Sequence, residues 1–207
     1  NQNCSVLPVR WELLMQKLVI ATLLLALASS ICMASEGEDQ AASFFKIYSS
    51  LCLKNLFKLE ELRETLKPMP KLPPDKAELF LAGKSGDAWP VPDKYATVVL
   101  ALLSGKSFCA VYVRKADTAA AIKMFTSMAA SAPFPIKVKL LKNETTQTIV
   151  NGQTQTISYE WSAPNAKRGM MFTLTTASAD YAQIQVLGSA AVVRLRHSPE
   201  LLKDIKK

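Results

Sequence analysis

The sequence predicts an α+β fold in which helices pack on one face of a mainly antiparallel sheet, in one domain stapled by a disulfide. Three observations predict it. Apolar residues recur at helical spacing between about residues 40 and 67. After residue 95 the pattern changes to short runs rich in β-branched and aromatic residues, separated by turn signals. The sequence shows no internal repeat and no strand–helix alternation of the kind that indicates a parallel sheet.

An apolar run stands ahead of this domain. Residues 15–34 have the three parts of a signal peptide: Lys17 supplies the positive charge, residues 18–28 are apolar, and Ala34 offers a small residue for cleavage before Ser35. At about 1.5 Å per residue, the apolar core is too short to cross a bilayer as a helix. We therefore expect residues 15–34 to be removed on export to the periplasm. Residues 1–14 precede a complete signal and are expected to be upstream read-through.

A lipid anchor would need a cysteine at the new N-terminus, and Cys32 is the only candidate. Ile31 stands before it at a position where lipoprotein signals carry a small residue. We therefore expect the exported domain, residues 35–207, to have no transmembrane segment, and a form anchored by a lipid on Cys32 is the less favoured alternative.

The cysteines agree with an oxidising compartment. Cleavage removes Cys4 and Cys32 and leaves Cys52 and Cys109, and an even pair in an exported domain predicts a disulfide. The sequence holds one histidine, His197, so the ligands of a metal site are lacking and we expect neither a metal nor a cofactor.

The elements follow in order from these patterns. Residues 40–67 predict one long helix or two helices that meet near Asn55, and residues 73–83 predict a short helix. Runs at 95–103 and 108–114 predict a hairpin, and Asp117 is placed to cap a helix that ends before Pro133. The rest reads as strands from about residue 136, with a hairpin at Asn151-Gly152 and a polar, loosely ordered tail from about His197.

The most function-like stretch is "GKSGDAWPVPDKY", which reads as a rigid surface loop. Prolines lower the ordering cost of binding and aromatic rings supply contact area. We expect Trp89 and Tyr95 to form the contact surface, with Lys84 and Lys94 at its rim. The alternative is that Trp89 packs into the core.

Catalytic motifs are weak by comparison. Gly83-Lys84-Ser85 and Gly105-Lys106-Ser107 end like a phosphate-binding loop, but Glu78 and Leu100 stand where its first glycine is required. With one histidine and no nucleophile elbow, we assign no catalytic residue. Carboxylates suited to glycan hydrolysis remain an alternative, and they comprise Glu78, Asp87, Asp93, Glu144, Glu160 and Asp180.

The stretches "CLKN", "KLPPDKAELFLAGKSGDAWPVPDKY", "FCAVYVRKA" and "ISYEW…FTLTTA" resemble a family of small exported (lipo)proteins of Gram-negative bacteria that has no assigned activity. The resemblance covers most of residues 44–193. It implies export, a single domain and a Cys52–Cys109 pair, and it adds no catalytic residue.

The charge completes the prediction. The chain carries 25 Lys and Arg against 17 Asp and Glu, for a net charge of +8, and its basic residues are dispersed rather than gathered in runs. This pattern favours an anionic envelope component or an envelope protein as partner over nucleic acid. We expect a non-enzymatic binding protein of the cell envelope. The alternatives are a carboxylate-dependent enzyme acting on cell-wall glycan, and an inhibitor or immunity-type protein.

Overall fold

The computed structural model describes residues 36–195, which lie within one compact unit, residues 35–207. The expected signal peptide, the read-through at 1–14, the cleavage site after Ala34, the lipidation candidate Cys32 and the tail from His197 lie outside the described residues. The helical elements are α2 (Glu36–Ile47), the π-helical turn η1 (Tyr48–Leu53), α3 (Leu59–Leu66), α4 (Pro74–Leu81) and α5 (Thr118–Ala129). The strands are β1 (Gly86–Val91), β2 (Val98–Leu103), β3 (Phe108–Val113), β4 (Lys137–Thr148), β5 (Gly152–Ser162), β6 (Arg168–Ala177) and β7 (Val186–Arg194).

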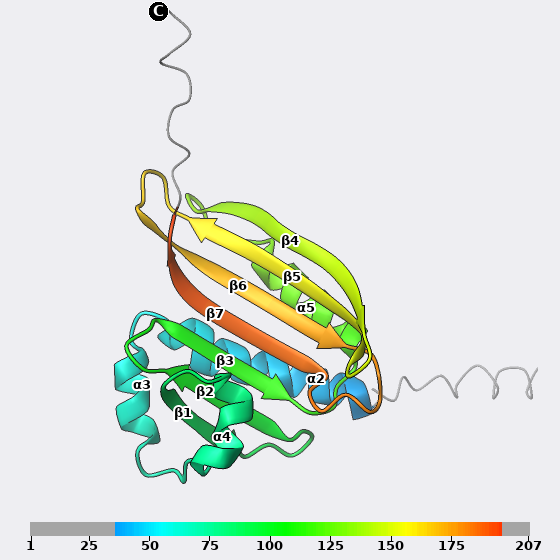
Figure 1. Ribbon diagram of the computed structural model, residues 1–207. Coiled ribbons are helices and arrows are strands. Elements are labelled where there is room, and N and C mark those ends of the chain that lie inside the picture. The colour runs from blue at the N-terminus through cyan, green and yellow to red at the C-terminus, as the bar shows by residue number, and fades with distance from the viewer. Residues whose placement is uncertain (1–35, 196–207) are drawn as a thin grey trace, which may run out of the picture. The chain divides into compact units, whose positions relative to one another are not determined.

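The seven strands form one antiparallel sheet in the order β1-β2-β3-β7-β6-β5-β4 (Figure 1). This confirms the predicted α+β class. Neighbours in sequence pair as hairpins, except that β7 lies between β3 and β6, so Phe108 stands opposite Ala191. Because every pairing is antiparallel, β1, β3, β4 and β6 all begin at the same end of the sheet.

Helices α2, α3 and α5 and the turn η1 pack on one face of the sheet and share its main core, which includes Phe44, Leu62, Leu100, Phe125 and Leu174. In Figure 1, α2 and α5 lie behind the strands. The short helix α4 packs instead on the other face, against β1 and β2. Every residue of β2 is buried, so this apolar strand needs cover on both faces, and α4 supplies the second cover.

Residues 40–67 form two helical segments, α2 with η1 and then α3. This is one of the two arrangements that the sequence predicts. The two segments are separated near Asn55, whose side-chain amide donates to the carbonyl oxygens of Ser50 and Leu51 at 2.9 and 3.0 Å. These bonds satisfy carbonyls at the end of η1, which lack partners once the helix stops.

The disulfide Cys52–Cys109 is present, with a Cα–Cα distance of 5.4 Å. It joins η1 to β3, and both cysteines are fully buried. Close approach of the helix to the sheet is possible here because β7 carries Gly188. A Cβ at that position would lie 2.6 Å from Cζ of Phe44, whose ring stacks on Tyr48. The Tyr48 hydroxyl donates to the carbonyl oxygen of Ser189 at 2.8 Å.

The segment predicted as a surface loop is in part a strand. Residues 86–91 form β1, which pairs with β2 from Gly86 opposite Leu103 to Val91 opposite Val98. Pro90 is compatible with this strand because β1 is an edge strand. Within residues 36–195, no helix is long and apolar enough to cross a membrane.

Candidate functional site

Trp89 does not belong to an exposed contact surface, and this part of the sequence prediction is wrong. Its side chain points from β1 into the main core and is 1% exposed. The ammonium of Lys71 lies 5.6 Å from the centre of the ring. Strand alternation decides the outcome, because β1 faces α3 on one side and every second residue must enter that interface.

Tyr95 and Lys94 are exposed, and Lys94 Nζ lies 5.0 Å from the centre of the Tyr95 ring. The turn is held by Asp93, whose side chain accepts hydrogen bonds from the backbone N–H groups of Tyr95 and Ala96, each at 2.9 Å. Partial burial raises the pKa of Asp93, but these two hydrogen bonds, together with the Ser43 side chain and the charge of Lys46, outweigh that effect and leave the pKa below its ordinary value. Tyr95 and Lys94 therefore sit on a rigid, well-supported turn.

Lys84 lies at the other end of β1 from this turn. The six residues of β1 separate the two, a span of about 20 Å at about 3.3 Å per residue. The structure thus leaves the four predicted binding residues in three places: Trp89 in the core, Tyr95 with Lys94 after β1, and Lys84 before it.

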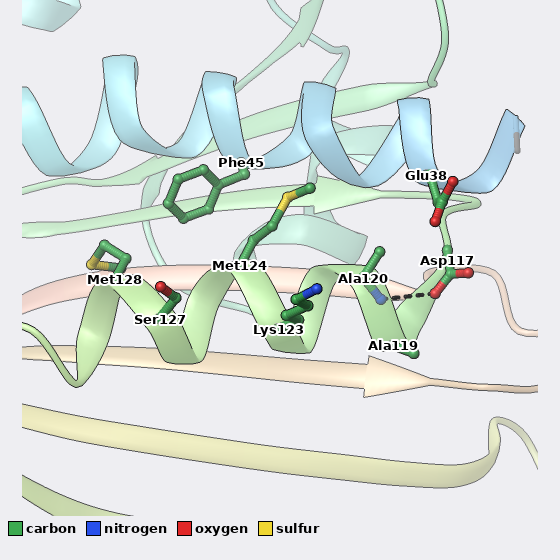
Figure 2. Close-up of a pocket in the computed structure, with 9 residues that line it drawn as sticks. All are labelled: Glu38, Phe45, Asp117, Ala119, Ala120, Lys123, Met124, Ser127 and Met128. Carbon is green, nitrogen blue, oxygen red and sulfur yellow. Dashed lines mark hydrogen bonds between the residues drawn. The ribbon is translucent and has the colours of Figure 1, made fainter. Parts of the chain in front are cut away.

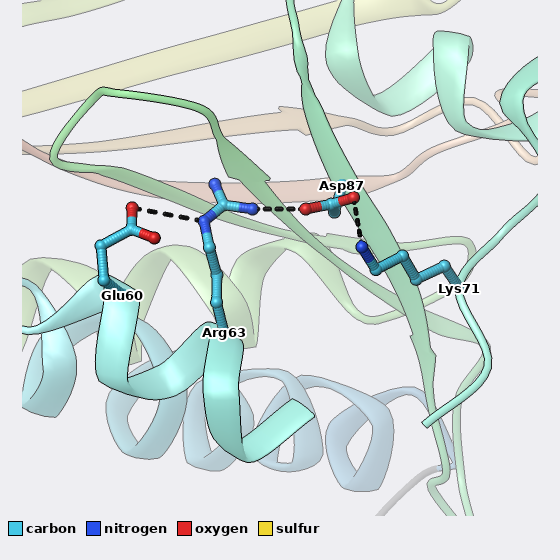
Figure 3. Close-up of polar contacts among 4 residues, drawn as sticks. All are labelled: Glu60, Arg63, Lys71 and Asp87. Carbon is cyan, nitrogen blue, oxygen red and sulfur yellow. Dashed lines mark hydrogen bonds and ion pairs between the residues drawn. The ribbon is translucent and has the colours of Figure 1, made fainter. Parts of the chain in front are cut away.

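Asp87 is the most heavily engaged carboxylate of the segment (Figure 3). Its Oδ2 lies 2.6 Å from Arg63 Nη1, and its Oδ1 lies 2.7 Å from Lys71 Nζ. Arg63 also contacts Glu60, at 3.4 Å. Both carboxylate oxygens are therefore paired, and the contacts join α3 and the chain before α4 to the edge strand β1.

The other carboxylates weighed for glycan hydrolysis stand on separate elements, and Asp180 is exposed in the connection from β6 to β7. Asp93 caps its turn, and Glu144 pairs with Lys142 at 3.0 Å. Glu78 lines a pocket of about 460 Å³ together with Asp87, and both Asp87 oxygens are engaged in ion pairs with Arg63 and Lys71. Glu160 stands on β5, opposite Lys139 and Met171. Among the described residues, no group of three His, Cys, Asp or Glu side chains could hold a metal ion.

An apolar groove of about 800 Å³ runs between α2 and α5 (Figure 2). Phe45, Met124 and Met128 line it, and Lys123 and Ser127 stand on α5 beside them. Ala119 and Ala120 line the groove at the first turn of α5, where their small side chains leave room. Asp117 caps the same helix, because its side chain accepts a hydrogen bond from the N–H of Ala120 at 2.8 Å. Flexible methionine side chains suit such a groove to apolar ligands of varied shape.

Basic side chains gather at the end of the sheet where β1, β3, β4 and β6 begin. Lys84 and Lys106 line one pocket, Arg168 pairs across strands with Arg194, and Lys137 opens β4. We call this surface the basic end; its exposed cations are Lys58, Lys84, Lys106, Lys137, Lys167, Arg168 and Arg194. Along the sequence they are dispersed, which is why sequence reasoning missed the cluster.

Two phenylalanines are exposed at this same end. Phe57 is 71% exposed and lines a pocket with Lys58 and Lys106, and also with Glu60 and Glu61. Phe134 is 98% exposed in the connection from α5 to β4, next to the point where the indole N–H of Trp161 donates to Ala129 O at 2.7 Å. The two rings are thus large apolar side chains exposed at the basic end.

The opposite end of the sheet has a different charge balance. It carries the acidic first turn of α2, formed by Glu36, Glu38 and Asp39, beside Asp117, whose backbone N–H donates to Gly37 O at 2.9 Å. Arg114 and Lys115 follow β3 at this end, so it carries both cations and carboxylates. The net positive charge of the chain is therefore unevenly placed within the described residues.

No protein-family model, curated protein or solved structure matches this chain.

Proposed function

We propose that this chain is an exported protein of the cell envelope that acts by binding rather than catalysis, and that the basic end is its contact surface for anionic lipid. The observation that carries the proposal is the gathering of cations and of exposed Phe57 and Phe134 at one end of the sheet. A cation near an anionic bilayer contributes about 1 kcal/mol, and aromatic rings settle at the boundary between headgroups and acyl chains.

Export is supported by two features that agree with one another. The disulfide Cys52–Cys109 is fully buried and joins two elements of the core, as expected of a protein that folds in an oxidising compartment. The first described helix, α2, begins at Glu36, directly after the predicted cleavage site. Intact mass of protein released by osmotic shock tests this: the expected species begins at Ser35 and carries the disulfide. A species that begins at residue 1, or that bears a lipid on Cys32, contradicts it.

Binding is tested by co-sedimentation of residues 35–207 with vesicles. We expect the protein to bind vesicles that contain phosphatidylglycerol, to ignore vesicles of phosphatidylcholine alone, and to dissociate as salt screens the charges. The Lys167→Glu/Arg168→Glu variant should bind at least about tenfold more weakly, since two favourable contacts of about 1 kcal/mol each are lost.

The matched control is Arg114→Glu/Lys115→Glu, which makes the same change of charge at the opposite end of the sheet. We expect it to bind like the parent protein. Equal losses in the two variants would mean that only net charge matters, and binding to neutral vesicles would remove the electrostatic basis of the proposal.

A further inference from the structure

The two Gly-Lys-Ser turns meet in space, although 22 positions separate them in the sequence. Ser85 and Ser104 are joined by a backbone hydrogen bond, from the N–H of Ser104 to the carbonyl oxygen of Ser85 at 2.9 Å. The turn at 83–85 precedes β1 and the turn at 105–107 joins β2 to β3. Because β1 starts where β2 ends, both turns fall at the same end of the sheet.

Together the turns line a pocket of about 640 Å³. Lys84 and Lys106 supply two ammonium groups, and the hydroxyls come from Ser85, Ser104 and Ser107. Among the described residues that line this pocket there is no carboxylate. Neither lysine forms an ion pair within residues 36–195, so both charges remain available to a ligand.

Both turns are tight and open to a ligand. Gly83 has a φ of 72° and Gly105 a φ of 63°, and a Cβ at either position would meet no atom within 4 Å, so the turns are open to solvent. The N–H of Lys84 already donates to the carbonyl oxygen of Leu81 at 3.0 Å, so the contacts offered to an anion by this turn come from its side chains.

The rest of the pocket wall is apolar. It is formed by Leu103, Phe108, Ala191 and Val192, at the adjoining ends of β2, β3 and β7. A purely inorganic anion would gain nothing from this wall, whereas an anion attached to a hydrocarbon group would cover it and gain free energy from the burial of apolar surface.

We propose that the two Gly-Lys-Ser turns form one binding pocket for a phosphate group, in which the lysines and serine hydroxyls contact the phosphate oxygens. Two cations and several O–H donors on one tetrahedral anion are the contacts that phosphate recognition needs. The inference deepens the proposed function, and it rests on that function for the expectation that the phosphate belongs to a lipid of the envelope.

The test is a titration of residues 35–207 with inorganic phosphate and, separately, with soluble dihexanoyl phosphatidic acid, followed by backbone amide chemical shifts at constant ionic strength. We expect saturable shifts at Ser85, Gly105 and Ser107. Tighter binding of the phosphatidic acid assigns the pocket to lipid phosphate, and equal binding of the two assigns it to phosphate alone. Linear, unsaturated shifts with both probes overturn the inference.

Variants separate the pocket from general attraction to the basic end. Lys84→Gln/Lys106→Gln should weaken phosphate binding at least about tenfold, as loss of two charge-assisted contacts predicts. The control Lys167→Gln/Arg168→Gln removes two cations of the same end that lie outside the pocket lining, and it should weaken phosphate binding clearly less than Lys84→Gln/Lys106→Gln does. Equal effects in the two variants overturn the inference.

The pocket and the proposed function fail in different ways. If Lys84→Gln/Lys106→Gln leaves phosphate binding unchanged while anionic vesicles still bind, the pocket is wrong and the lipid surface stands. If phosphate saturates the pocket while anionic vesicles do not bind, the pocket stands and the lipid surface is wrong.

Discussion

Arg63 on α3 and Asp87 on the edge strand β1 lie 2.6 Å apart, from Nη1 to Oδ2, in a contact that is largely shielded from water. The Arg63 side chain is only 13% exposed, and its Nη2 is buried without a hydrogen-bond partner. The pair holds α3 against a strand that has only one neighbour in the sheet. Removing one partner of such an ion pair lowers the free energy of unfolding by more than the pair itself contributes, because the remaining charge stays buried without its partner.

Asp87→Ala should therefore lower the free energy of unfolding by about 2–4 kcal/mol, because it leaves the Arg63 guanidinium without its carboxylate. Urea unfolding followed by circular dichroism measures this. Glu60→Ala is the matched control, since Glu60 contacts the same arginine but is 75% exposed, and its loss should stay below about 1 kcal/mol. Similar losses in the two variants would contradict a structural role for the Arg63–Asp87 contact.

Trp89→Ala should destabilise the domain by about 3–5 kcal/mol, since the indole is buried in the main core and its removal leaves a cavity. Tyr95→Ala, on the exposed turn after the same strand, should change the free energy of unfolding by less than about 1 kcal/mol. Thermal or urea unfolding of both variants checks the assignment of Trp89 to the core. A Trp89→Ala protein as stable as the parent would restore Trp89 as a surface residue.

The double variant Cys52→Ala/Cys109→Ala should lose about 2–5 kcal/mol, because the bridge closes a loop across 57 positions of the sequence. Guanidinium unfolding with and without reductant measures the effect. The parent protein in reductant should approach the variant, whereas the variant itself should not respond to reductant. A reductant effect that persists in the variant would show that the bridge is not its source.

Burial raises the pKa of Tyr48 well above its ordinary value, so the folded state holds the phenol proton more tightly than the unfolded chain does. The contribution of Tyr48 to stability should be constant below about pH 9 and should fall as the pH rises past about 10, where the unfolded tyrosine ionises. Tyr48→Phe should make this alkaline decline shallower. Some decline should remain, because burial also raises the pKa of Tyr112.

At neutral pH, Tyr48→Phe should cost about 1 kcal/mol through loss of the hydrogen bond to Ser189. Tyr181→Phe is the control, because Tyr181 is 67% exposed and should leave the pH profile of the parent protein unchanged. Urea unfolding at a series of alkaline pH values gives both slopes. An unchanged slope in Tyr48→Phe would contradict the role of the buried phenol.

Local patterns in the sequence were enough to predict most elements. The hairpin at Asn151-Gly152, the cap at Asp117 and the break near Asn55 are each set by a few adjacent residues, and the structure has all three. The disulfide could also be predicted, because only Cys52 and Cys109 remain beyond the expected leader.

Strand β1 was missed because Pro90 and its neighbours carry turn chemistry, and only pairing with an apolar partner makes them a strand. The same pairing turns Trp89 inward, which no local pattern announces. In this protein, short-range periodicity and capping are determined by the sequence itself, since the atoms that decide them are close along the chain. Which turns meet, as 83–85 and 105–107 do, was decided only by the tertiary structure, because strand register brings together residues whose sequence separation carries no signal.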